Sequence, residues 1–408
     1  MQVAEATGYR ALLHNRPFRL LLLAYAINTF GNWITVVAAL ALATFKWHAS
    51  PLELGGMVSV FLAPAAVAGP LSGWLADRLD RRCILVAANL IACVVVLAMP
   101  LAASIWHAYL ILVVLRLVSS VNQPVMSALV PSLVRAEDIT RANGILLQPA
   151  HATRAVSPLV GGLIVGGLGA SAAFMVDAAT FLCAAALIGL LLAGAGETAC
   201  SPASQAELHL VPGASSIALR GLIPLAMIAL AASFSFGALD SVAPLYVRDL
   251  LNLDVGAFGA VVSAIGLGAM IGGLAPGIRP EADRPLLFGM LVAIGGFLII
   301  AATQSFWTLL IGSWIAGFGS GVVLTSGQTL IHCSIARAHH ATALGMMSAV
   351  VNVGALAGIT IASLLVSAAG VTVTLWLLAA LLTASLPAAP GKSRRIQASA
   401  SFETTSPR

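Results

Sequence analysis

The chain has very few charged residues. Only 9% of its 408 residues are Asp, Glu, Lys or Arg, whereas hydrophobic residues make up 60%. Ordinary soluble proteins are about 25% charged, and a chain with so little charge cannot cover a water-facing surface with polar groups. This composition excludes a set of ordinary soluble domains and predicts a protein that crosses a membrane many times.

Motifs for metal, ATP or enzyme chemistry are also lacking. The five cysteines form no CxxC pair, and there is neither an HExxH motif nor a carboxylate pair at helical spacing. The phosphate-binding loop has the pattern G-x-x-x-x-G-K-S/T. The sequence PGKS at 390–393 matches its end, but Leu386 stands where the pattern needs its first glycine. We therefore expect no enzyme, no metal and no cofactor, and we expect a proton gradient to supply any energy. A separate ATPase subunit remains an alternative.

Twelve apolar segments are long enough to span a bilayer. A helix needs about 20 mostly apolar residues for this. The layout near 69–89 returns loosely near 268–290, as two duplicated six-helix bundles would show. The expected fold is all-α, with bundles at 1–194 and 219–390, a linker at 195–218 and a disordered tail at 391–408. The expected spans are 18–45, 51–76, 83–104, 107–131, 143–167, 170–194, 219–247, 255–278, 284–303, 305–332, 341–368 and 370–389.

Basic residues lie almost entirely on one side of the predicted membrane. Sixteen of the 20 Lys and Arg residues fall in segments on the side of the N-terminus, and only Lys46 and Arg248 fall in the opposite loops. Positive residues mark cytoplasmic loops, so both termini are expected in the cytoplasm and the chain in the inner or plasma membrane. The first apolar run is too long for a signal peptide and is expected to remain as a span.

The sequence GWLADRLDRR at 73–82 places five charges after an apolar run. Its residues Gly73, Asp77, Arg81 and Arg82 match the loop signature G-x-x-x-D-x-x-G-R-R/K of the major facilitator superfamily, with Asp80 in place of a glycine. This variant resembles the branch of enterobactin exporters and macrolide efflux proteins. The segments 15–33 and 124–146 also resemble that branch, and the resemblance covers about 200 N-terminal residues well.

The charges of this loop predict a conformational gate. An aspartate at a helix end and nearby arginines can form charge-assisted hydrogen bonds with each other and with neighbouring helix ends. Gly73 would allow close helix approach, while Asp77, Arg81 and Arg82 would latch one conformation. The alternative, favoured more for Arg82, is that the arginines only mark topology and contact lipid headgroups.

Four charged residues fall inside predicted spans, namely Arg116, Arg154, Asp177 and Asp240. Charge at membrane depth is costly and usually functional. A carboxylate in a low dielectric can gain and lose a proton near neutral pH, so Asp177 and Asp240 are candidates for proton coupling. Arg116 and Arg154 are candidates for the same function, since they can act on such a carboxylate. Each aspartate is alternatively a structural partner of one of the two arginines.

The resemblance adds expectations for three further elements. Arg116 is similar in position to an arginine of proton-coupled relatives, and it would tune a carboxylate or bind an anionic group. The segment with Pro158, Gly161 and Gly162 resembles the antiporter motif G-P-x-x-G-G, which accompanies export and lets the helix bend. Asn32 stands where relatives often carry an acidic residue.

A substrate cavity is predicted near the membrane midplane between the bundles. Its candidate residues are the polar Asn32 and the aromatic Phe30, Trp33 and Trp314, and packing is the alternative role of the aromatic residues.

Together these features predict a secondary transporter working by alternating access. It would export a small amphipathic or apolar molecule, such as a drug or secondary metabolite, by proton antiport. The alternatives are a siderophore exporter of the same fold and a transporter-like importer or sensor. We expect a monomer whose partners are its substrate, protons and the lipid bilayer, with no nucleic acid.

Overall fold

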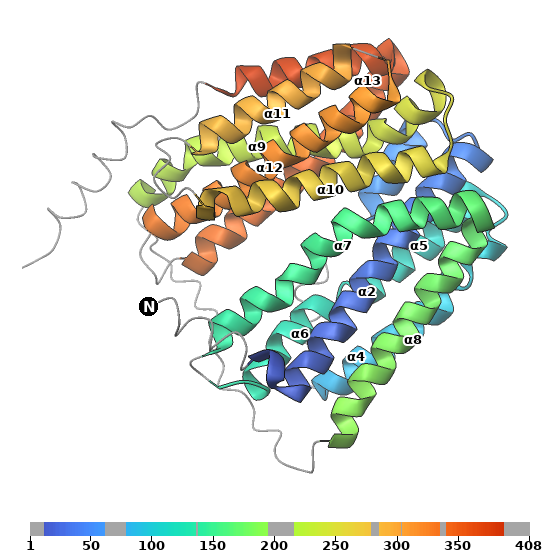
Figure 1. The fold of residues 1–408 in the computed structure, drawn as a ribbon, viewed down its shortest axis with the longest axis vertical. Helices are drawn as coiled ribbons and strands as arrows, with labels where there is room; N and C mark the ends of the chain where they lie inside the picture. Colours follow the sequence, from blue (N-terminus) through green and yellow to red (C-terminus); the bar gives the residue numbers. More distant parts are fainter. Residues whose placement is uncertain are drawn as a thin grey trace, which may run out of the picture. The chain divides into compact units, whose positions relative to one another are not determined.

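The computed structural model describes residues 12–61, 79–135, 138–194, 216–278, 285–302, 304–334 and 340–386. Within these ranges the regular structure is helical throughout, without a strand (Figure 1). The chain divides into two compact units. One comprises Met1–Ala49, Met57–Gln205 and Asp254–Ser263, and the other Ser50–Gly56, Ala206–Leu253 and Ala264–Arg408.

The first unit is built around its first long helix. This helix, α2, packs against both α7 and α8, and Figure 1 shows it between them. Asn15 caps its N-terminus by accepting from the Phe18 amide, a residue type that favours this position. The helices of this unit are α2 (Arg16–Ala41), α4 (Arg81–Val96), α5 (Ile105–Ser119), α6 (Asn122–Leu129), α7 (Ile139–Leu168) and α8 (Ala170–Gly194).

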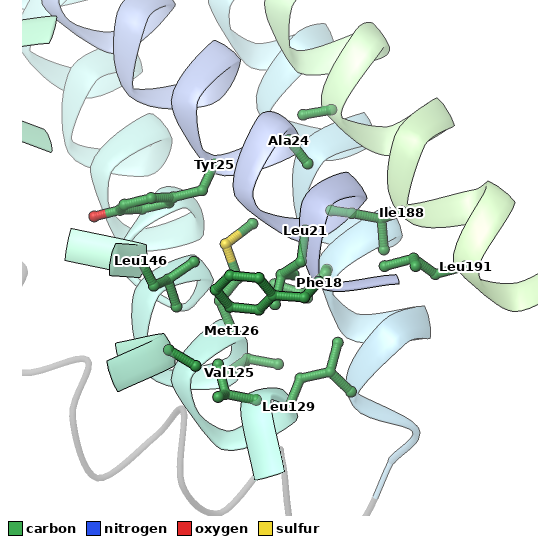
Figure 2. Packing of buried hydrophobic residues seen from close by; sticks show 14 of the residues in the cluster. Phe18, Leu21, Ala24, Tyr25, Val125, Met126, Leu129, Leu146, Ile188 and Leu191 are labelled. Atoms are coloured by element: carbon green, nitrogen blue, oxygen red, sulfur yellow. The ribbon is translucent and has the colours of Figure 1, made fainter. Parts of the chain in front are cut away.

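Apolar side chains fill one end of this unit. Phe18 and Leu21 of α2 are fully buried and meet Met126 of α6, Leu146 of α7 and Ile188 of α8 (Figure 2). Ile84 and Leu85 of α4 belong to the same cluster, which therefore joins five helices, so the helix positions at that end are set by packing.

The second unit consists of long apolar helices packed in pairs. The helix α13 packs along α9, and α11 packs along α12. A smaller apolar cluster joins Leu225 and Ile228 of α9 to Met290 of α11 and Val323 of α12. The bounds are α9 (Ser216–Leu245), α10 (Val255–Ile278, from Ala264 onward in this unit), α11 (Pro285–Ala302), α12 (Phe306–Ser334) and α13 (His340–Ala384).

The all-helical membrane fold predicted from the sequence is confirmed. Nine helical stretches in the described ranges are long and apolar enough to cross a membrane. The helix α13 covers the last two expected spans, which Gly370 separates with φ 84° and ψ 169°. Only glycine adopts such a conformation readily.

The fourth expected span, 107–131, differs in detail because it is interrupted. The helix α5 ends at Ser119 and α6 begins at Asn122. Pro124 lies in the first turn of α6, where it cannot donate to the preceding turn. The second expected span is described only to Phe61, and 391–408 and most of 195–218 lie outside the described residues.

Candidate functional site

Asp177 is fully buried on α8, in the first unit. Its Oδ2 accepts a hydrogen bond from Thr35 Oγ1 of α2 at 2.5 Å, and its Oδ1 accepts one from Thr180 Oγ1 at 3.0 Å. A hydroxyl can donate to a carboxylate and can turn to accept from a carboxylic acid. These two partners therefore suit both protonation states of the Asp177 side chain.

Gly31 allows α2 to approach α8 at this carboxyl group. A Cβ atom at position 31 would overlap Thr180 Oγ1 and Asp177 Oδ1. The same helix supplies Thr35 one turn later, so a Gly–x–x–x–Thr spacing on α2 provides both the space and a donor for Asp177.

The described residues that contact Arg116 of α5 are neutral. Its Nη1 donates to Asn32 Oδ1 at 3.0 Å, and its guanidinium carbon lies 4.7 Å from the centre of the Phe61 ring. Its Nε is buried and has no hydrogen-bond partner among the described residues. Within the described chain the structure thus gives Arg116 no ion pair with Asp177, whose partners are hydroxyls.

A chain of side-chain amides continues from Arg116. Asn32 Nδ2 donates to Asn28 Oδ1 at 2.9 Å, and Asn28 Nδ2 donates to Asn89 Oδ1 at 2.7 Å. Asn89 Nδ2 then donates to Asn122 Oδ1 at 3.4 Å. Asn28, Asn89 and Asn122 are all buried. Asn28 and Asn89 each donate to the next amide, as buried polar groups normally do, whereas the Nδ2 of Asn122 has no hydrogen-bond partner among the described residues.

Arg154 lies on α7 and contacts an aromatic ring of α2. Its guanidinium carbon is 5.2 Å from the centre of the Trp33 ring, as in a cation–π contact. Trp33, expected to line a cavity, thus contacts a charged residue that was expected to serve in proton coupling. Phe30, on the same helix, is half-buried.

The predicted helix-bend motif lies in the middle of α7. Pro158 interrupts the helix ladder, and the next amide, that of Leu159, donates to Ser263 Oγ of α10 at 2.8 Å. A Cβ at Gly259 would overlap the Pro158 carbonyl and lie 3.0 Å from Gly162 Cα, and one at Gly161 would lie 3.3 Å from Ile34 Cα of α2. Small residues therefore bring α7 close to α2 and to the start of α10.

Two arginines of the charged loop bind helix ends. Arg81 Nη1 donates to the Ala128 carbonyl at 2.8 Å, and Arg82 Nη1 donates to the Leu191 carbonyl at 3.1 Å. Both carbonyls lie in the last turn of their helices, where a cation is favourable. Asp80 caps α4 by accepting from the Arg82 amide at 2.7 Å. The predicted gate residues Gly73 and Asp77 lie outside the described residues.

The remaining predicted residues belong to the second unit. Asp240 is half-buried on α9. Trp314 on α12 is 40% exposed, and its ring lies 5.9 Å from that of Phe318. These two residues therefore belong to a different unit from Asp177, Arg116, Arg154, Phe30, Asn32 and Trp33.

Sequence reasoning missed the neutral partners of the site, namely Gly31, Thr35 and Thr180 around Asp177 and Asn28, Asn89 and Asn122 in the amide chain. One signal was available. Asn28 and Asn32, and likewise Gly31 and Thr35, recur one turn apart in an otherwise apolar helix.

Long apolar helices with buried charged and amide side chains are typical of a polytopic membrane protein. The sequence matches the Major Facilitator Superfamily over residues 21–279 and 281–398. The chain belongs to this superfamily, and it is a multi-pass, non-enzymatic membrane transporter.

Among curated relatives, the chain is similar to the uncharacterized MFS-type transporter YfiS of Bacillus subtilis, with 28% identity over 42% of this chain and 41% of YfiS. The matched part of this chain thus spans less than half of that relative. It is also 26% identical to the multidrug resistance protein MdtG of Salmonella paratyphi C, over 68% of this chain and 69% of MdtG.

Solved structures share the fold. A bacterial homologue of the human lysosomal transporter Spinster superposes with a TM-score of 0.73 at 17% identity, covering 96% of this chain and 98% of that one. The nucleoside transporter NupG gives a TM-score of 0.72 at 13% identity over 92% and 98%.

Proposed function

We propose that this protein exports a small amphipathic or apolar molecule, a drug-like compound or secondary metabolite, in exchange for protons. Proton entry would drive export by alternating access. The proposal places the chain in the enterobactin exporter and macrolide efflux branch, in the inner or plasma membrane with both termini in the cytoplasm.

The burial of Asp177 carries this proposal. Asp177 is a fully buried carboxyl group at membrane depth, and hydroxyls contact both of its oxygens. Ionisable groups in such places usually serve ion or proton pathways. Because the hydroxyls of Thr35 and Thr180 can serve either protonation state, the site can change charge without leaving a buried group unpaired.

Two further observations support export of drug-like molecules. The similarity to MdtG, named a multidrug resistance protein, spans about two thirds of both chains. The Pro158–Gly162 segment resembles the antiporter motif and lies at a glycine-lined contact of α7. In this proposal the residues Gly73, Asp77, Arg81 and Arg82 form the cytoplasmic gate, and the predicted bundles 1–194 and 219–390 alternate the access to the substrate.

The test uses everted vesicles from a host that lacks its own drug pumps. Respiration acidifies the vesicle interior, and the accumulation of Hoechst 33342, ethidium and fluorescein is followed with and without nigericin. We expect nigericin-sensitive accumulation of at least one dye in vesicles that contain the protein. If none accumulates above control vesicles, drug export is refuted.

The Asp177→Asn variant separates coupling from translocation. It should lose accumulation driven by the pH gradient but keep exchange of labelled for unlabelled dye, since exchange needs no net proton movement. Asp249→Asn, at an exposed carboxylate of the second unit, is the control and should retain pH-driven accumulation. Asp177→Asn with normal gradient-driven accumulation would overturn the role of this carboxyl group.

A further inference from the structure

The chain of hydrogen-bonded side chains that begins at Arg116 both starts and ends in the fourth span. It starts on α5, crosses α2 through Asn32 and Asn28 and α4 through Asn89, and ends at Asn122 on α6. Arg116 and Asn122 lie on either side of the interruption of the fourth span. Every amide donates in the same direction, so the hydrogen bonds reinforce one another. The chain thus fixes the Arg116 guanidinium against both halves of this span.

Among the described residues, no carboxylate touches the guanidinium that is held in this way. Its contacts within the described chain are an amide oxygen, the face of the Phe61 ring and the longer-range charge of Asp177, and its Nε has no partner. Charged groups in protein interiors are normally paired with an opposite charge or fully hydrogen-bonded. An arginine with a fixed position, a free donor and no carboxylate in contact is suited to bind a carboxylate or phosphate from outside the chain.

We propose that Arg116 binds an acidic oxygen group of the transported molecule, a carboxylate or phosphate, beside the aromatic face of Phe61. Asn32, Asn28, Asn89 and Asn122 are its positioning residues. The preferred substrates would then be amphipathic anions with an apolar or aromatic body. This inference rests on the proposed transport function, because it names the class of molecule that the same protein carries.

Binding to the purified full-length protein in detergent tests the proposal without transport. Fluorescein and rhodamine 123 share one ring scaffold and carry opposite charges, so fluorescence polarisation compares anion with cation directly. The wild type should bind fluorescein about 10- to 100-fold more tightly, as one hydrogen-bonded charge pair allows. No binding of fluorescein, or equal binding of the two dyes, would overturn the proposal.

Two variants assign the preference to the arginine. Arg116→Gln removes the charge and should abolish the preference for fluorescein. Asn32→Asp keeps the acceptor oxygen beside Arg116 but adds a competing carboxylate, and it should also abolish the preference. Thermal unfolding checks that each variant is folded. If one variant does not fold, the other still tests the proposal. Retention of the preference in a folded variant of either kind would overturn the proposal.

The vesicle experiment distinguishes this inference from the proposed function. If fluorescein binds through Arg116 but no dye moves with the pH gradient, proton-driven export fails and the anion site stands. If dyes move with the gradient but fluorescein binding is unchanged in the Arg116→Gln variant, the anion site fails and export stands.

Discussion

Gly31 gives the sharpest test of how the buried carboxyl site is built. A Cβ at this position would overlap Thr180 Oγ1 and Asp177 Oδ1 and would lie 2.9 Å from Thr180 Cβ. Carbon atoms pack at about 3.5–4.0 Å, and the Thr180 Cβ is fixed to its helix. The Gly31→Ala substitution therefore requires α2 and α8 to separate by roughly 1 Å.

The expected cost combines two effects. Overpacking in a tight contact costs about 1–3 kcal/mol, and weakening a hydrogen bond to a charged group costs up to about 1.5–3 kcal/mol. We expect Gly31→Ala to lower the free energy of unfolding by about 2–5 kcal/mol. Denaturation with SDS in mixed micelles, followed by tryptophan fluorescence, measures this quantity.

Gly189 provides the matched control. It lies on α8 like Asp177, and a Cβ there would meet nothing within 4 Å. Gly189→Ala should leave the protein unchanged or stabilise it by about 0.5–1 kcal/mol, since alanine favours helices. In a double-mutant cycle, Gly31→Ala should cost less unfolding free energy in the Thr180→Ala background than in the wild type, because the overlapping hydroxyl is then absent. If Gly31→Ala is as stable as Gly189→Ala, the close approach of α2 to α8 is refuted.

Three further substitutions test other contacts. Asn89→Ala breaks the amide chain at its middle and should cost about 2–4 kcal/mol in the same SDS titration, because it leaves buried amides unpaired; a cost under about 0.5 kcal/mol would contradict the chain. Ser263→Ala leaves the Leu159 amide without its acceptor and should speed hydrogen–deuterium exchange at that amide about tenfold or more, whereas unchanged exchange would refute the contact. Arg81→Gln removes a cation from the Ala128 carbonyl and should lower the free energy of unfolding by about 1 kcal/mol. Arg81→Lys should recover part of this loss. If neither variant changes the free energy of unfolding, the arginine serves topology alone.

The helices could be predicted from the sequence because each is a long apolar run. Charges and glycines separate the runs, and the break at Gly370 lies at the first residue of the expected span 370–389. The interruption of the fourth span was missed, although Pro124 is its visible cause. A proline near the end of a long apolar run either kinks a span or interrupts it. The length of the apolar run does not show which of the two occurs.

The charged members of the site could be found in the same way, but their partners could not. Asp177 and Arg116 are conspicuous because charge at membrane depth is rare. Their contacts depend on which helices are neighbours and on their rotation, and neither follows from one helix's pattern. The structure pairs Asp177 with hydroxyls and Arg116 with an amide, whereas their charges alone suggested an ion pair.

Infrared difference spectroscopy of the purified protein tests most directly whether Asp177 carries the coupled proton. Spectra recorded in acidic and alkaline buffer should differ by the carbonyl stretch of a protonated, buried carboxyl group. We expect this band to be absent from Asp177→Asn and present in Asp249→Asn, which alters an exposed carboxylate. A band of full strength in Asp177→Asn would contradict the account, because the coupled proton would then reside on another group.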